Sequence, residues 1–366
     1  MRIAFALAVH KPKDERVFYQ QAKALTKAGH QIFIISARDA TCDIENCFTF
    51  NNDQLSKRET INKICIGLHQ FYPQKVICDN PLSVLSACKY KRESKQENIK
   101  IYYDITEWYP AKIHLTGNFF LTKILKIMAL ISLSALVGFL ADGFIFGEYY
   151  KSIPFKRFFF WKKNICIPYY ASLNQAVTYP ENDISNHLTF FYAGYLKKGY
   201  GFNQCLSVVK KVADLFPQIK FSFEIYAKDE LPEKTEGTEN LTIKFNPLVP
   251  FLDFCKVYGK ADIYLDLRKK NWENSHSLPI KLFYYMAVSR PVIYTDLKAI
   301  KKEVKEIDEV GFLVNPNNIN DIAEKISLYI KDKNLYRLHS NNAGNLVREK
   351  YNWHLIEERF IKFIES

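Results

Sequence analysis

Short apolar runs alternate with longer segments of helical periodicity along almost the whole chain. Residues 277–316 show this alternation most clearly. Leu282, Phe283 and Met286 recur at helical spacing, and residues 291–294 (Pro-Val-Ile-Tyr) form a short, apolar, β-prone run. The segment therefore predicts a helix, a buried strand, a second helix and a last strand that is stopped by Asn-Pro.

Similar strand patterns recur on both sides of a polar stretch, and helical patterns separate them, as parallel βαβ units require. The predicted strands are 2–9, 31–36, 75–78, 99–103, 143–146, 164–167, 188–193, 219–227, 241–245, 262–266, 291–294 and 311–314. We therefore expect an α/β protein with two doubly wound, Rossmann-like halves that bind ligands at the carboxyl ends of their strands.

The length of 366 residues also favours two domains. The stretch 171–187, which contains Pro, Asn and acidic residues, is the predicted linker. We expect an N-terminal domain over residues 1–170 and a C-terminal domain over residues 188–350. With 48% hydrophobic and 25% charged residues, the chain has the composition of a globular protein.

The eight cysteines are scattered without a CxxC pair or metal-ligand spacing, which predicts reduced thiols in a cytosolic protein. The first apolar run is interrupted at once by His10, so it predicts a strand and not a signal peptide. Residues 1–180 carry 24 Lys/Arg against 14 Asp/Glu, and this excess of ten positive charges indicates an anionic partner. The motifs of nucleic-acid modules are missing, so we expect no nucleic-acid partner.

Four stretches resemble one protein family. They are "HKPKDERVFYQQAKALTKAGHQIFIIS" from His10, "YYDITEWYPAK" from Tyr102, "LPIKLFYYMAVSRPVIYTDLKAI" from Leu278 and "EVGFLVNPNNINDIAEKI" from Glu309. These words are similar to the GT-B glycosyltransferases, in particular the retaining family four (glycosyl transferases group 1) of bacterial surface-polysaccharide synthesis. The third resembles that family's Leu-Pro-x-Lys-x-x-Glu-Tyr-Met-Ala-x-Gly-x-Pro-Val-Ile pattern.

The resemblance implies two Rossmann-like domains that face a cleft, with a final helix, residues 351–366, packed back on the first domain. It implies transfer of a sugar from a nucleotide-diphosphate donor to a glycan, with retention of configuration. Aspartates spaced Asp-x-Asp, which bind a metal in the other large glycosyltransferase fold, do not occur. We therefore expect no cofactor and no metal, with the nucleotide sugar as co-substrate.

In the resembled family, the turn after the strand 188–193 lies against the donor diphosphate, which here implicates Gly194, Lys198 and Gly199. A lysine at that place would stabilise the departing charge in place of a metal, and we choose Lys198. The alternative is a solvated surface lysine. The remaining donor-side positions implied by the resemblance are Ser275, His276, Ser277, Lys281 and Tyr284.

Tyr284 stands where the family has the glutamate that holds the nucleotide ribose. A phenol offers one oxygen and no charge, so donor binding should weaken or be rebuilt. Glu273 is a candidate for part of the missing role, or a loop surface charge. Because of this departure, an alternative function stays open: a catalytically weak or silent GT-B relative that acts as a glycan-binding or partner subunit.

The acceptor-side candidates are His10, Arg16, Asp104 and Glu107. His10 follows the first strand, and Asp104 and Glu107 come at the end of the strand 99–103, so all should emerge at the cleft edge. By analogy we assign catalytic roles to Glu107, as the base, to His10 and to Lys198. A capping Asp-x-x-Glu box would explain Asp104 and Glu107 equally well, and a helix cap is the favoured interpretation of Asp14.

Two further segments indicate how the protein relates to a membrane. Residues 127–141 lack charge but are too few to span a bilayer, so they predict a buried helix before a strand. Residues 151–163 interleave five cations with aromatic residues, which suits a membrane surface, with a partly buried amphipathic helix as the alternative. The membrane-surface candidates are Lys156, Arg157, Phe159, Trp161, Lys162 and Lys163.

Taken together, these features predict a metal-independent glycosyltransferase at the cytoplasmic, inner face of the cell membrane, bound peripherally. Its expected partners are a nucleotide-sugar donor, a glycan or polyprenyl-linked acceptor, and an anionic membrane surface.

Overall fold

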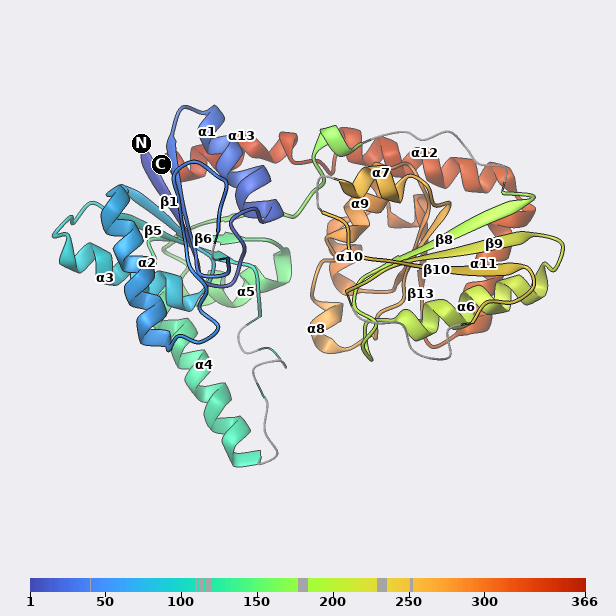
Figure 1. Cartoon of the computed structure of the whole chain (residues 1–366), viewed down its shortest axis with the longest axis horizontal. Coiled ribbons are helices and arrows are strands. Elements are labelled where there is room, and N and C mark those ends of the chain that lie inside the picture. Colours follow the sequence, from blue (N-terminus) through green and yellow to red (C-terminus); the bar gives the residue numbers. More distant parts are fainter. Residues whose placement is uncertain are drawn as a thin grey trace. The chain divides into compact units, whose positions relative to one another are not determined.

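The computed structural model describes residues 1–39, 41–108, 111, 115, 120–176, 184–228, 236–250 and 253–366. It divides into two compact units, of which unit 1 is Met1–Pro168 with Ile356–Ser366, and unit 2 is Tyr169–Leu355. Each unit has a parallel sheet with helices packed around it (Figure 1). The expectation of an α/β protein with two doubly wound halves is confirmed.

Unit 1 contains a seven-stranded sheet of order β3-β2-β1-β4-β5-β6-β7, in which all pairs are parallel. Its strands are β1 (Arg2–Leu7), β2 (Gln31–Ser36), β3 (Cys47–Thr49), β4 (Lys75–Cys78), β5 (Lys100–Ile105), β6 (Gly143–Phe146) and β7 (Lys163–Cys166). The central strands are buried on both faces, which explains their almost continuous apolar sequences.

The helices of unit 1 include a π-helical segment, Glu15–Ala22, which continues into α1 (Lys23–Lys27). The others are α2 (Lys57–Phe71), α3 (Pro81–Glu93), α4 (Phe120–Leu140), α5 (Tyr149–Phe158) and α13 (His354–Glu365). The last of these belongs mostly to unit 1, where the Lys75 ammonium donates to the carbonyl oxygens of Ile364 and Glu365.

Unit 2 contains a six-stranded parallel sheet of order β10-β9-β8-β11-β12-β13. Its strands are β8 (His187–Ala193), β9 (Lys220–Tyr226), β10 (Leu241–Asn246), β11 (Ile263–Asp266), β12 (Val292–Thr295) and β13 (Gly311–Val314). Its α-helices are α6 (Phe202–Leu215), α7 (Phe254–Tyr258), α8 (Trp272–Ser275), α9 (Lys281–Ala287), α10 (Lys298–Glu303), α11 (Ile319–Lys331) and α12 (Lys333–Glu349), and short 3-10 turns lie at Leu173–Gln175 and Ile307–Glu309.

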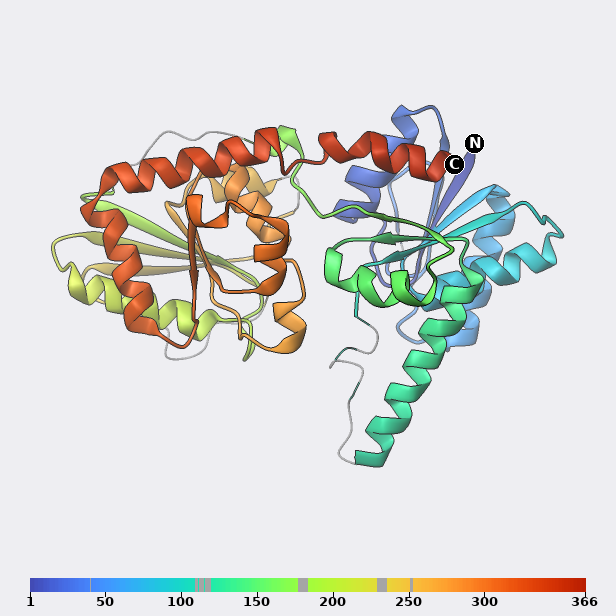
Figure 2. The ribbon, with the colours of Figure 1, turned by 180° about the vertical axis from the view of Figure 1, so that it is seen from behind.

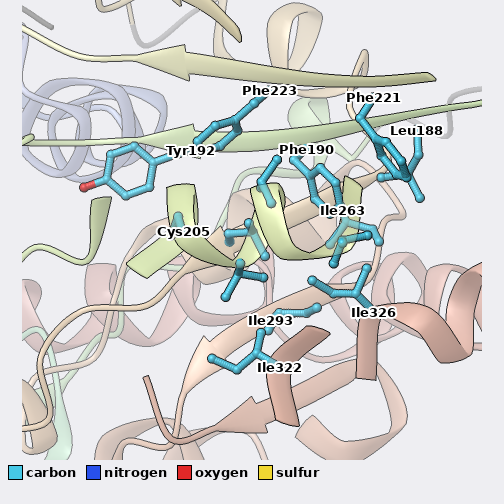
Figure 3. Packing of buried hydrophobic residues seen from close by; sticks show 14 of the residues in the cluster. Leu188, Phe190, Tyr192, Cys205, Phe221, Phe223, Ile263, Ile293, Ile322 and Ile326 are labelled. Atoms are coloured by element: carbon cyan, nitrogen blue, oxygen red, sulfur yellow. The ribbon is translucent and has the colours of Figure 1, made fainter. Parts of the chain in front are cut away.

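The core of unit 2 forms where β8 and β9 pack against helices (Figure 3). Phe190 and Phe221 stack with ring centroids 6.0 Å apart, and Ile322 and Ile326 of α11 belong to the same buried cluster. This packing fixes the strand ends that carry the polar residues described below.

All twelve predicted strands are present, and the prediction missed only the three-residue β3 among the described strands. Of the expected linker, residues 177–183 lie outside the described part of the chain. One helix prediction is wrong. Residues 127–140 belong to the longer helix α4 (Phe120–Leu140), and most of the side chains of this helix are exposed instead of buried. The reason is that an apolar run alone does not show whether a helix faces a protein core.

Candidate donor and acceptor sites

The turn after β8 packs tightly against the chain that follows β11. Gly201 has a φ of +91°, and a Cβ there would collide with the backbone of Leu267. The Lys269 amide donates to the Gly199 carbonyl at 3.0 Å. Position 201 therefore requires glycine, because of its positive φ and because a Cβ has no room there. This close packing brings the carboxyl ends of β8 and β11 together.

Three charged side chains meet at these strand ends, and we call Asp266, Arg268 and Lys281 the donor cluster. The Arg268 Nε donates to one Asp266 carboxylate oxygen at 2.8 Å, and its terminal nitrogen contacts the other oxygen. The Lys281 ammonium, from the start of α9, donates to the Ala193 carbonyl. A Cβ at Gly194 would lie 2.9 Å from the Lys281 Nζ, so glycine leaves room for that ammonium.

The donor cluster has two cations around one carboxylate. Burial would raise the pKa of Asp266, but Arg268 and Lys281 hold it below its ordinary value. Burial lowers the pKa of Lys281 to about 8, although the negative charge of Asp266 acts to raise it. With Lys281 protonated, the donor cluster carries one net positive charge. Its nitrogen atoms can also donate hydrogen bonds, and both properties suit the binding of a diphosphate.

The other predicted donor residues are distributed unevenly around this cluster. Lys198 is exposed on the turn, Ser275 is buried at the end of α8, and the Ser277 hydroxyl donates to the Glu273 carbonyl at 2.9 Å. The His276 ring lies beside Trp272, with centroids 4.8 Å apart. Because α9 has only seven residues, we assign the electrostatic role to charged side chains and not to the N-terminus of this helix.

Tyr284 is almost completely buried, with 1% of its surface exposed. Its ring meets Phe254 edge-on at 5.9 Å between centroids. The position therefore contributes packing inside unit 2, and the expected nucleotide contact by its hydroxyl would require this ring to move. The assignment of Tyr284 as a donor contact stays a prediction.

A second polar site lies at the carboxyl ends of β1, β4 and β5 in unit 1. A small pocket there is lined by Phe5, Leu7, His10, Asp14, Arg16, Val17, Gln21, Ile77, Asp79, Asp104 and Thr106. The sequence had placed His10, Arg16 and Asp104 together, and the pocket does contain all three. The Asp14 carboxylate accepts from the amides of Arg16 and Val17, so its predicted role as a cap is confirmed.

Asp79 organises the His10 side of this pocket. Its carboxylate accepts from the amides of Ala8, Val9 and His10 at 2.9–3.0 Å, and the His10 Nδ1 lies 2.9 Å from it. Burial lowers the pKa of His10, but the hydrogen bond and charge of Asp79 outweigh it and raise the pKa to about 9. His10 is therefore an imidazolium at neutral pH.

Arg16 and Asp104 form a buried, bidentate ion pair. The Arg16 Nε and a terminal nitrogen donate to Asp104 at 2.8 and 3.0 Å, and the other terminal nitrogen donates to the Ile167 carbonyl at 2.6 Å. Gln21 adds a further donor to Asp104 at 2.7 Å. With 1% and 3% exposure, the pair holds the pocket in place, and its direct contact with an acceptor stays a prediction.

Glu107 is exposed two residues beyond β5. Asp104 lies inside β5 and its carboxylate faces Arg16, so the alternative of a capping box at these two residues is wrong. The assignment of Glu107 as a base stays a prediction.

The sequence missed three residues of these sites: Asp79, Asp266 and Arg268. Each lies at or just after the carboxyl end of a predicted strand, which is the signal that could have found them. These three residues match no short sequence motif, so a search for motifs does not find them.

One group of potential metal ligands occurs among the described residues, at Cys65, His69 and Glu93. The Cys65 thiol and the His69 Nε2 lie 3.3 and 3.2 Å from one Glu93 oxygen, and Lys89 is 3.5 Å from the other. These residues lie on α2 and at the end of α3, separate from the polar pocket of unit 1. Their mutual hydrogen bonds and the lysine account for them without an ion.

The membrane-surface candidates need two corrections. Phe159 is 5% exposed and packs in the core of unit 1, whereas its neighbours Phe158 and Phe160 are exposed. The Lys162 ammonium donates to carbonyls at the end of α4, including Gly138 at 2.8 Å and Phe139 at 2.6 Å, and burial lowers its pKa. Lys162 is therefore a helix cap. The exposed candidates are Lys156, Arg157, Trp161 and Lys163.

Residues 187–332 match the family model described as Glycosyl transferases group 1. This part of the chain is similar to the group 1 glycosyltransferases. The resemblance inferred from the sequence is confirmed over these residues. No curated protein matches the chain.

Solved structures place this chain on the GT-B fold. The Anabaena Alr3699/HepE structure in complex with UDP-glucose has a TM-score of 0.73 at 15% identity and covers 100% of both chains. Sucrose-phosphate synthase from Thermosynechococcus elongatus has a TM-score of 0.72 at 14% identity, covering 100% of this chain and 98% of that one. S. aureus TarM has a TM-score of 0.61 at 16% identity, over 84% of this chain and 58% of that one.

The raised pKa of His10 makes a prediction about stability. The contribution of the His10–Asp79 pair is fully present below about pH 6.5, the ordinary histidine pKa, and is lost as pH rises through about 9. Replacing His10 by Gln should therefore cost up to about 3 kcal/mol in free energy of unfolding at pH 6 and almost nothing at pH 9.5. Urea unfolding at the two pH values checks this, and an equal cost at both would contradict it.

Proposed function

We propose that this protein is a glycosyltransferase that uses a UDP-sugar, transfers its sugar with retention of configuration, and needs no metal. The observation that carries the proposal is the donor cluster, where Arg268 and Lys281 surround Asp266 at the carboxyl ends of β8 and β11. UDP is suggested by fold relatives whose structures contain UDP or UDP-glucose.

Transfer of a sugar leaves negative charge on the departing nucleotide diphosphate. Lys281 and Arg268 would stabilise that charge from a partly buried, prearranged position, where electrostatic interactions are stronger than in water. Lys198, on the exposed turn beside them, could approach from the solvent side. The protonated imidazole of His10 can donate a hydrogen bond to a sugar or phosphate oxygen but cannot accept a proton, so the base role remains with Glu107.

For the acceptor, we propose a polyprenyl-linked glycan used in cell-surface polysaccharide synthesis, at the cytoplasmic face of the cell membrane. The excess of positive charge in residues 1–180 supports an acceptor with a phosphate-bearing lipid. The exposed Phe158, Phe160 and Trp161 beside Lys156 and Arg157 support docking on a bilayer surface.

Thermal-shift measurements with UDP, GDP, CMP and dTDP test the choice of nucleotide. A ligand that binds only the folded protein raises the melting temperature, and at equal concentration the tighter ligand gives the larger rise. We expect UDP to give the largest shift. A larger shift with another nucleotide would overturn the UDP assignment, while equal absence of shift with all four would overturn the donor site.

Metal independence predicts that activity persists in excess EDTA. Side-chain cations of the donor cluster would supply the charge that Mn²⁺ or Mg²⁺ supplies elsewhere. Release of UDP from UDP-sugars, with and without chelator, is the measurement. Activity that disappears with EDTA and returns with Mn²⁺ would contradict this part of the proposal.

Surface docking predicts binding to liposomes that contain anionic lipid, weakened by salt. Each cation near such a surface contributes about 1 kcal/mol and is screened. Replacing Lys156, Arg157 and Lys163 by Gln should remove most of the salt-sensitive binding. Lys162 is kept because it caps α4. Equal binding of wild type and variant to anionic vesicles would contradict docking through this segment.

The alternative function is a weak or silent relative that binds glycans or a partner subunit, and the buried Tyr284 favours it. It predicts UDP binding without turnover, whereas the proposed enzyme shows both. Introducing Glu at Tyr284 would place a carboxylate in a buried site and cost stability. Tyr284→Phe, which keeps the ring, is the cleaner variant, and unchanged UDP affinity is expected from it.

A further inference from the structure

Helix α4 presents an apolar surface to solvent. It contains 21 residues, has a mean hydropathy of 2.0 in its most apolar window, and only 11% of that window is buried. Figures 1 and 2 show it projecting from the rest of unit 1. The exposed large apolar side chains are Phe120, Leu121, Ile124, Leu125, Met128, Ile131, Leu136, Phe139 and Leu140.

These side chains occupy a broad part of the helix circumference. At about 100° per residue they span an arc of about 200°, roughly twice the minimum stripe of a helix that packs on one protein core. A partner helix would cover a narrower stripe, whereas lipid can cover the whole arc. Lys123 and Lys126 lie outside this arc, where long side chains can reach towards polar headgroups.

The end of α4 nearest the core is firmly held. Val137 and Gly138 are buried, and a Cβ at Gly138 would collide with the ring of Phe159. Phe139 lies 6.3 Å from Trp161 between ring centroids. The exposed aromatic and cationic residues of 156–163 therefore lie beside the held end, as side chains at the headgroup level do beside an inserted segment.

We propose that α4 is embedded in a lipid bilayer, with its apolar arc in the hydrocarbon and the rings of Phe160 and Trp161 at the headgroups. This goes beyond surface docking, because binding through hydrocarbon contact does not depend on salt. It does not depend on the proposed donor or acceptor.

The test compares wild type with Leu125→Gln/Met128→Gln/Ile131→Gln by flotation with vesicles of phosphatidylcholine and phosphatidylglycerol, washed at high salt. We expect a salt-resistant bound fraction in the wild type. The triple variant should lower the salt-resistant partition coefficient by more than about tenfold, since three apolar side chains leave the hydrocarbon.

The matched control replaces three exposed leucines of unit 2, Leu215, Leu328 and Leu338, by Gln, and should leave salt-resistant binding unchanged. Circular dichroism and thermal unfolding verify that each variant is folded. A tryptophan introduced at Leu125 should be quenched by lipids brominated on the acyl chain.

Two results would overturn the proposal. One is wild-type binding that high salt removes completely. The other is a lipid-free dimer that the α4 variant converts to monomer while membrane binding is unchanged, because α4 would then cover a second copy of the chain.

Discussion

Replacing Arg16 by alanine should lower the free energy of unfolding by about 3–5 kcal/mol, because the substitution leaves the buried Asp104 carboxylate without its guanidinium. The pair is bidentate and almost fully buried, and Arg16 also donates to the Ile167 carbonyl. Gln21 would remain as a donor to Asp104 but carries no charge. Urea unfolding followed by circular dichroism measures the loss.

The double variant Arg16→Met/Asp104→Leu separates two contributions to the free energy of unfolding, the cost of an unpaired buried charge and the cost of lost packing. Since it removes both charged partners, it should be clearly more stable than Arg16→Ala. The exposed pair Lys13–Asp43 provides a matched control, and Lys13→Ala should leave the free energy of unfolding almost unchanged. A cost below about 1 kcal/mol for Arg16→Ala would show that the pair does not hold the pocket together.

Replacing Lys281 by alanine should weaken binding of the UDP-sugar by about 1.5–3 kcal/mol, or roughly 10- to 150-fold, the scale of a hydrogen bond to a charged group. The fold should survive because Asp266 keeps its bidentate partner Arg268. Since the lysine has a pKa of about 8 and only its protonated form attracts the diphosphate, wild-type affinity should fall as pH rises through that value.

Titration calorimetry at several pH values measures both effects. The matched control is Lys211→Ala, an exposed lysine on α6 in the same unit, which should leave affinity unchanged. Lys198→Ala should weaken binding less than Lys281→Ala, since Lys198 is exposed and more strongly hydrated. Unchanged affinity in Lys281→Ala, or a greater loss in Lys198→Ala, would remove Lys281 from the donor site.

The sheets were predictable because parallel strands buried on both faces leave continuous apolar runs between helical patterns. Strand β3 escaped because three residues, Cys47–Thr49, carry too little pattern. Helix α4 was misjudged for a different reason. Apolar sequence reports a preference for a non-aqueous environment, but it does not distinguish a protein core from another apolar phase.

The site was predictable only in part. His10 and Lys281 could be assigned from their places beside strand ends and from the family resemblance. The role of Arg16 depended on a partner 88 positions away, Asp104, and on the depth of burial, which no local pattern encodes. The same holds for Tyr284, whose position matches the family's glutamate while its ring packs inside unit 2.

The central claim is that a nucleotide diphosphate binds at the donor cluster. A crystal structure of the full chain with UDP tests it most directly. We expect the diphosphate to lie within hydrogen-bond distance of the Lys281 Nζ, beside Gly194 and the Arg268 guanidinium. UDP bound elsewhere, with Lys281 still donating only to the Ala193 carbonyl, would contradict it.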